Sequence, residues 1–165
     1  MTLPRQDWIT RMIERGASGL RRSPLNNLSE EEITFIFSEA QSIGINIDIL
    51  RPNEGDSTGY SDDMDVIFIR GDIYPDMDGT HPRDIMNVRA VLAHEYYGHR
   101  ANRGTHWDIG DWRDEFRASY QAAKNTPNLT IQERIQLLND ARARASEAGV
   151  SIKHNKYMLE VLYGR

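Results

Sequence analysis

The sequence predicts an α+β protein, with a short sheet of two or three strands packed on one helix and a helical C-terminal half. Two short apolar segments, residues 45–50 and 65–70, have the composition of strands. Segments with helical periodicity follow from about residue 83 onward. Strands followed by helices are typical of the α+β class. No repeat, low-complexity tract or long linker divides the chain, so we expect a single domain over residues 1–165.

Composition excludes several kinds of partner. The chain is 39% hydrophobic and 27% charged, which is typical of a soluble globular protein. Its net charge of -5 leaves no excess of Lys and Arg to neutralise phosphates, so nucleic acid is not expected as a partner. No stretch approaches the ~20 apolar residues of a membrane span, and no signal peptide is recognisable. The expected location is therefore cytoplasmic, with delivery as a secreted effector left open.

Both predicted strands lie in the first half of the chain. A short helix is expected at residues 8–14, and the capping box at residues 29–32 opens a second helix. Residues 45–50 alternate between apolar and polar side chains, as a half-buried strand does. Residues 52–63 are rich in turn formers and predict a loop. Residues 65–70 are more continuously apolar, which indicates the more buried strand.

Four helices are predicted in the second half. The first begins near residue 83 or 87 and fades by residue 104, and its apolar residues line one broad side. A capping box at residues 130–133 opens the third helix, which Gly149 ends. The second and fourth helices are expected over residues 111–124 and 157–162.

The first of these helices carries two histidines and a glutamate, in the segment His94-Glu95-Tyr96-Tyr97-Gly98-His99. In the common His-Glu-x-x-His zinc motif the histidines are four residues apart, roughly 40° apart around a helix with about 100° per residue. Here they are five apart, which is about 140° on a regular helix. A local π-helical turn would return both to one face, and the missing Cβ of Gly98 would assist it. Because the chain has no cysteine, a metal must be held by His, Asp or Glu.

A catalytic zinc site takes three protein ligands and leaves one position open. The candidates for the third ligand are His106, Asp108, Asp111, Asp114 and Glu115. Glu115 is the first choice, because the apolar residues after it imply a helix packed on the core that would direct its side chain. Asp111 is the second choice and His106 the third. The competing interpretation of the acidic residues is a solvated helix start, stabilised by the helix dipole.

The segment at residues 94–99 resembles the HEXXGH motif of the dipeptidyl peptidase III family of zinc peptidases. In that family the third ligand is the second Glu of an EEXXAE segment. The matching segment here, residues 114–119, has Asp for the first Glu and Ser119 for the last. The resemblance covers about 26 residues and implies one zinc ion per chain, with Glu95 as the general base and as ligands His94, His99 and Glu115. The aminopeptidase specificity of those much longer enzymes is not implied.

The compact form, AHEYYGHRANRG followed by DEFRASY, also resembles the small zincin-like metallopeptidase domains of bacterial polymorphic toxins and effectors. This second resemblance implies a small zincin-like domain in which the helix of residues 94–99 is the active-site helix. It also implies a peptide or protein substrate and an immunity or regulatory protein as a partner.

The implied activity is zinc-dependent hydrolysis of a peptide bond, assisted by proton transfer at Glu95. An electrophile must also stabilise the oxyanion. Tyr120 and His106 are the leading candidates, beside Tyr97 and Arg100. By analogy with other zincins, the strand at residues 66–70 would supply an edge to which a peptide substrate adds.

Two other functions keep the same residues. The site could hydrolyse a non-protein amide, such as one in a peptidoglycan fragment. Alternatively, the chain could be a non-catalytic helical interaction module with a structural metal or none. Glu95 distinguishes a catalytic site from this interaction module, because a structural zinc site fills all four positions with protein ligands and needs no unligated base.

Overall fold

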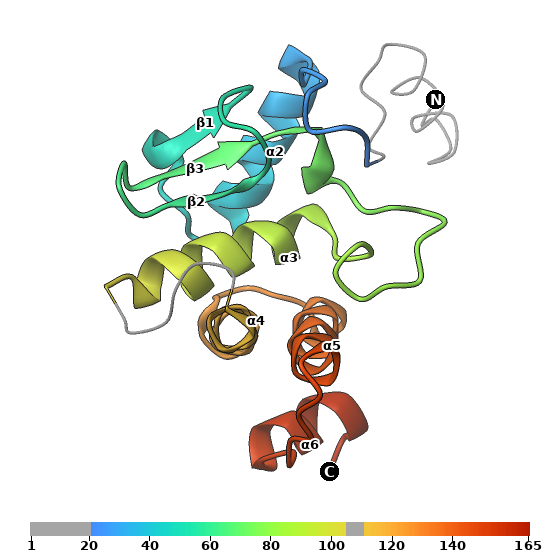
Figure 1. Ribbon diagram of the computed structural model, residues 1–165. Helices are drawn as coiled ribbons and strands as arrows, with labels where there is room; N and C mark the ends of the chain where they lie inside the picture. Colours follow the sequence, from blue (N-terminus) through green and yellow to red (C-terminus); the bar gives the residue numbers. More distant parts are fainter. Residues whose placement is uncertain (1–20, 105–110) are drawn as a thin grey trace, which may run out of the picture.

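The computed structural model describes residues 21–104 and 111–165 and confirms the α+β class. Figure 1 shows a small sheet at one end of the molecule and a helical C-terminal half. The helix expected at residues 8–14 and the candidate His106 lie outside the described residues. No helix of the described part is long and apolar enough to span a membrane.

The sheet is mixed and has the order β1-β3-β2, formed by β1 (Leu50–Pro52), β2 (Gly59–Ser61) and β3 (Val66–Ile69). β3 pairs in parallel with β1 and antiparallel with β2. It confirms the strand predicted at residues 65–70, and its central position explains its nearly continuous apolar sequence. The prediction that this strand forms an edge for a peptide substrate is wrong, because β3 lies between β1 and β2. β2 lies in the segment predicted to be a loop.

The strand predicted at residues 45–50 is largely a 3₁₀ turn, Ile47–Ile49, and only its last residue begins β1. Asn46 precedes the turn, and its side chain accepts a hydrogen bond from the backbone N–H of Asp48. This local bond favours the turn over an extended backbone. The alternating pattern reflects burial rather than pairing. Ile45 is a core residue and Ile47 and Ile49 pack against the core, whereas the polar residues between them are exposed.

The predicted helices of the described part are confirmed, with shifts of a few residues at their ends. Their bounds are α2 Glu30–Ser42, α3 Val88–Ala93, α4 Trp112–Asn125, α5 Ile131–Glu147 and α6 Lys156–Tyr163. Both predicted capping boxes form, at Ser29 and at Thr130. α3 begins at the later of its two predicted starts, where the Asn87 side chain accepts from the N–H of Ala90.

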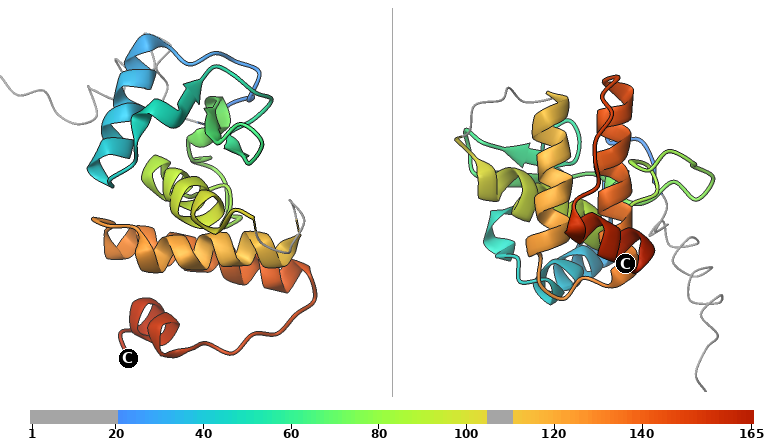
Figure 2. Two further views of the ribbon diagram at one scale, coloured as in Figure 1. Left: turned by 90° about the vertical axis from the view of Figure 1, so that its left-hand side faces the viewer. Right: turned by 90° about the horizontal axis from the view of Figure 1, so that it is seen from below.

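α3 and its continuation through His99 lie in the middle of the fold (Figures 1 and 2). The sheet and α2 lie on one side of this central helix, and α4 and α5 lie on the other, with α6 beyond them. Its fully buried side chains join the two halves of the core, since Leu92 belongs to the same apolar cluster as Ile67, Ile69, Leu137 and Leu138. The central helix is therefore held from both sides.

Candidate metal centre

The central helix widens into a π-helical turn over His94–His99, as the five-residue spacing of the histidines predicts. The backbone N–H of Arg100 donates to the carbonyl oxygen of Glu95, five residues earlier, which is the hydrogen bond of a π-helix. The turn brings the two imidazoles together, with ring centroids 4.7 Å apart. His94 is buried and His99 is mostly buried. Both rings therefore lie on one side of the helix, facing α4.

Gly98 explains how α4 comes so close to this turn. A Cβ at this position would lie 2.4 Å from the carbonyl oxygen of Ala118 in α4. Real Cβ atoms do not approach a backbone so closely, and therefore only glycine allows the two helices to make this contact. The role of Gly98 is thus the close approach between helices rather than the widening of the turn alone.

α4 contributes Glu115 from its first turn. Glu115 Oε2 lies 3.0 Å from Nε2 of His94 and 3.3 Å from Nε2 of His99. One potential ligand atom from each of these residues lies within 4.8 Å of the others, so the group can hold a metal ion. The set of two imidazoles and one carboxylate has the composition of a catalytic zinc site.

The charges of this group are coupled. Burial lowers the pKa of the His99 imidazole, but hydrogen bonds to Asp114 and Glu115 outweigh it and raise this pKa to about 10. Burial also raises the pKa of the Glu115 carboxyl, but hydrogen bonds from the two imidazoles hold it well below its usual range. Without a metal the centre is therefore an ion pair of protonated His99 and ionised Glu115. A divalent cation would replace the proton on His99.

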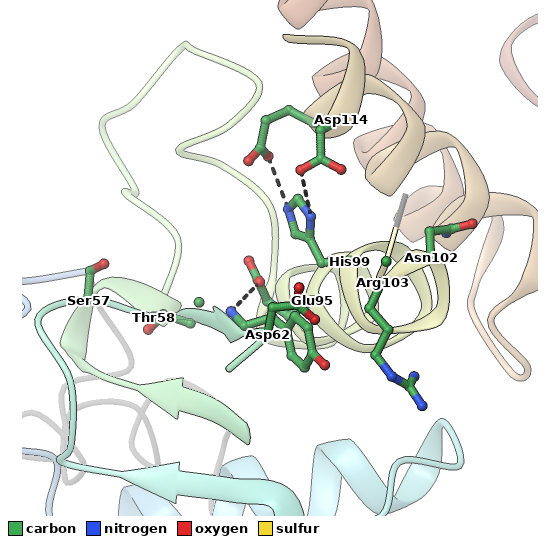
Figure 3. A pocket seen from close by; sticks show the side chains of 12 residues that line it. Ser57, Thr58, Asp62, Glu95, His99, Asn102, Arg103 and Asp114 are labelled. Atoms are coloured by element: carbon green, nitrogen blue, oxygen red, sulfur yellow. Dashed lines mark hydrogen bonds and ion pairs between the residues drawn. The ribbon is translucent and has the colours of Figure 1, made fainter. Parts of the chain in front are cut away.

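The other two acidic candidates on α4 take supporting positions. Asp114 Oδ2 lies 3.3 Å from Nδ1 of His99, and its other oxygen accepts from Arg117 at 3.1 Å. Asp114 therefore orients His99 from the nitrogen that does not face Glu115 (Figure 3). Asp111 caps α4 by accepting from the backbone N–H of Arg113 and pairs with the guanidinium of that residue. It is a helix cap and does not belong to the cluster of potential ligands.

Glu95 faces a pocket of about 330 Å³ that His99 and Glu115 also line (Figure 3). The residue is only 8% exposed, and its Oε2 accepts from the backbone N–H of Tyr60 at 2.8 Å. Tyr60 belongs to β2, one of the two edge strands of the sheet. A carboxylate beside the cluster of potential ligands is thus held by the strand that forms one wall of the pocket.

The structure does not bring Tyr120 to the centre, so its prediction as an oxyanion stabiliser is corrected. Tyr120 follows Glu115 by five residues, which turns its side chain about 140° around α4. Its ring stacks on Phe116 and its hydroxyl accepts from Asn155.

The two lesser candidates are also engaged elsewhere. Tyr97 donates to the carbonyl oxygen of Ile43, and Arg100 pairs with Asp65. Among the described residues that line the pocket, Arg103 is the one guanidinium. The sequence analysis did not single it out.

Three further residues behind the centre were not recognised from the sequence, where Ser119 appeared only as a departure from the family pattern. Ser119 lies 2.7 Å from Nδ1 of His94 and donates to Asp140 of α5 at 2.6 Å. Arg144 of α5 contacts both Asp140 and Glu115. The available signal was an aspartate within the apolar stripe of a helix, between Leu137 and Ala141.

The four residues that the resemblance implies, His94, Glu95, His99 and Glu115, thus lie around one pocket and its inner wall. No protein-family model, curated protein or solved structure matches this chain.

Proposed function

We propose that the protein is a zinc metallopeptidase. The observation that carries the proposal is the combination of three potential ligands in one cluster with a second carboxylate, Glu95, that lies beside them and is held by β2. A structural metal site has no need of such an unligated base. Nitrogen and oxygen ligands in this number favour zinc among the common divalent metals.

Among the described residues, the cluster of His94, His99 and Glu115 contains no fourth ligand. A metal held by these three residues alone would keep one coordination position for a water molecule, as a catalytic zinc ion does. Bound zinc would supply Lewis acidity, which polarises a scissile carbonyl and makes a water molecule more acidic. Glu95 would accept the proton of the attacking water and deliver it to the leaving nitrogen. Asp114 and Ser119 would hold the two imidazoles in place meanwhile.

A peptide is the favoured substrate because a strand of the sheet, β2, lines the pocket. Tyr60 pairs with Ile67 on β3, yet its backbone N–H points away from β3 to Glu95. The side of β2 that does not pair with β3 therefore faces Glu95, and an extended peptide lying along it would be placed beside this carboxylate. The resemblance to effector domains extends the proposal to a protein substrate, with an immunity or regulatory protein as a partner.

The proposal is tested by measuring zinc content and hydrolysis of a peptide library in Glu95→Gln and His99→Ala. We expect about one zinc per chain in wild type and in Glu95→Gln, and a loss of zinc in His99→Ala. Hydrolysis should fall by about 10²–10⁴-fold in Glu95→Gln, because the amide cannot accept the proton. Glu54→Gln makes the same chemical change in an exposed loop and serves as the control.

Full activity of zinc-loaded Glu95→Gln would exclude the proposed role of Glu95. If wild type binds zinc but hydrolyses no peptide, the result would instead favour an interaction module with a structural metal.

A further inference from the structure

A buried polar chain extends from the metal centre into α5. The Oγ of Ser119 lies 2.7 Å from Nδ1 of His94, and its hydroxyl donates to Oδ2 of Asp140 at 2.6 Å. Ser119 and Asp140 are both 0% exposed. α5, which contributes no ligand to the cluster, thus reaches His94 through one intervening side chain.

The same chain reaches the carboxylate of the cluster. Arg144, one turn after Asp140 on α5, lies 3.3 Å from Oδ1 of Asp140 and 3.4 Å from Oε2 of Glu115. Asp140 and Arg144 therefore act from one helix on two of the three potential ligands. α5 is thus connected to His94 through Ser119 and to Glu115 through Arg144.

Burial of Asp140 opposes folding unless the carboxylate is compensated. Removing a carboxyl group from water opposes folding, and an ion pair and hydrogen bonds offset this cost only in part. On α5 the buried apolar residues Leu137 and Ala141 flank Asp140 in the sequence. The position of Asp140 is therefore explained better by its contact with Ser119 than by packing.

The direction of the hydrogen bonds shows what this contact does. The single hydroxyl proton of Ser119 is donated to Asp140. In its hydrogen bond with His94, Ser119 must therefore be the acceptor. Nδ1 of His94 must then carry a proton, so Nε2, which lies 3.0 Å from Oε2 of Glu115, is the nitrogen left to bind a metal ion. A hydrogen bond of this kind fixes the tautomer of a metal-binding imidazole and increases its basicity.

We propose that Asp140, acting through Ser119, is a positioning residue that presets His94 as an Nε2 ligand. The inference rests on the proposed metal site but not on the reaction that the site performs. It assigns a function to α5, since the carboxylate that orients His94 comes from a helix distant in the sequence from the ligands.

The test compares zinc affinity, by competition with a chelator at fixed pH, in Ser119→Ala and Asp140→Asn. We expect Ser119→Ala to weaken zinc binding by about 10–100-fold, the range found when the partner of a ligating imidazole is removed. Asp140→Asn keeps the shape of the side chain and removes its charge, so its loss should have the same sign and be smaller. The visible spectrum of the cobalt-substituted protein should also shift in both variants, because it reports the ligand geometry.

Thr126→Val is the matched control. It removes another fully buried hydroxyl just after α4, one without a hydrogen-bond partner among the described residues. We expect it to leave the zinc affinity and the cobalt spectrum unchanged. A general loss of packing would affect all three variants, whereas a positioning role affects only the two in the chain behind His94.

Wild-type zinc affinity in both Ser119→Ala and Asp140→Asn would overturn the inference. A wild-type protein that binds zinc without hydrolysing peptides would overturn the peptidase proposal alone, and the affinity comparison would still decide the role of Asp140. A wild-type protein that binds no zinc would overturn both.

Discussion

At the scale of single residues, Gly98 shows how one missing methyl group permits the centre. The turn that carries both histidines lies against the backbone of α4 at this position, and α4 carries Glu115. A side chain at residue 98 would therefore separate the histidines from the carboxylate as well as loosen the packing.

We expect Gly98→Ala to destabilise the protein although alanine is the better helix former. The propensity gain is about 1 kcal/mol, whereas overpacking costs typically about 1–3 kcal/mol and the obstacle here is a backbone carbonyl that cannot rotate away. Thermal unfolding of the metal-free protein measures the net effect, and zinc affinity should fall with it. Gly59→Ala is the control, because a Cβ there meets nothing within 4 Å. A Gly98→Ala variant as stable as wild type would contradict the close approach of the helices.

At the scale of elements, the start of α4 is the feature on which the site depends most. This helix begins three residues before Glu115 and opens with the side-chain cap of Asp111. Fraying of the first turn would release the carboxylate of the cluster. Capping and metal binding are therefore linked through the helix start.

Asp111→Ala should cost about 1 kcal/mol of stability, the typical value of a lost N-cap, while one zinc per chain is retained. Asp111→Asn should behave as wild type, because asparagine caps a helix equally well. Unfolding by denaturant and metal analysis measure the two effects. Complete loss of zinc from Asp111→Ala would instead identify Asp111 as a ligand, the second choice of the sequence analysis.

At the scale of the whole molecule, metal binding and folding are coupled, because the ligands lie on two helices that only the folded chain brings together. We expect zinc to raise the free energy of unfolding by about 2.7 kcal/mol when free zinc reaches about 100 times its dissociation constant. Calorimetry with and without a chelator measures this shift. His99→Ala should show none, and a zinc effect of equal size in that variant would contradict the assignment of the site.

The metal-free protein should be most stable in mildly acidic solution. The pKa of His99 is raised to about 10, above its ordinary 6.5, so its stabilisation is complete below pH 6.5 and is lost as pH rises toward 10. The lowered pKa of Glu115 adds stabilisation that is present above its ordinary value of 4.5 and is lost on acidification. Between pH 6.5 and 10 the free energy of unfolding should fall by at most about 1.4 kcal/mol per pH unit.

Zinc should cancel this trend, because it competes with the proton on His99 and its stabilising effect should therefore grow over the same interval. Unfolding curves of both forms across this pH range measure the difference. A pH-independent stability of the metal-free form would contradict the ion pair between His99 and Glu115.

The sequence by itself determined the features whose causes are local. The capping boxes at Ser29 and Thr130 satisfy N–H groups within a few residues and therefore predict helix starts correctly. The five-residue spacing of His94 and His99 required a π-helical turn if both were to face one ion, and the turn is present. Glu115 was selected because an amphipathic helix fixes the direction of its side chains.

Only the tertiary structure decided the features that depend on which segments meet. β2 is three residues long and is recognised by its pairing with β3, not by its composition. The spacing from Glu115 already turns Tyr120 away on α4, but its contact with Asn155 at the start of α6 followed from how these helices pack. Asp140 reaches His94 across more than forty residues of sequence, and no local pattern encodes such a contact. Contacts of this kind depend on how helices pack, which is a property of the folded chain as a whole.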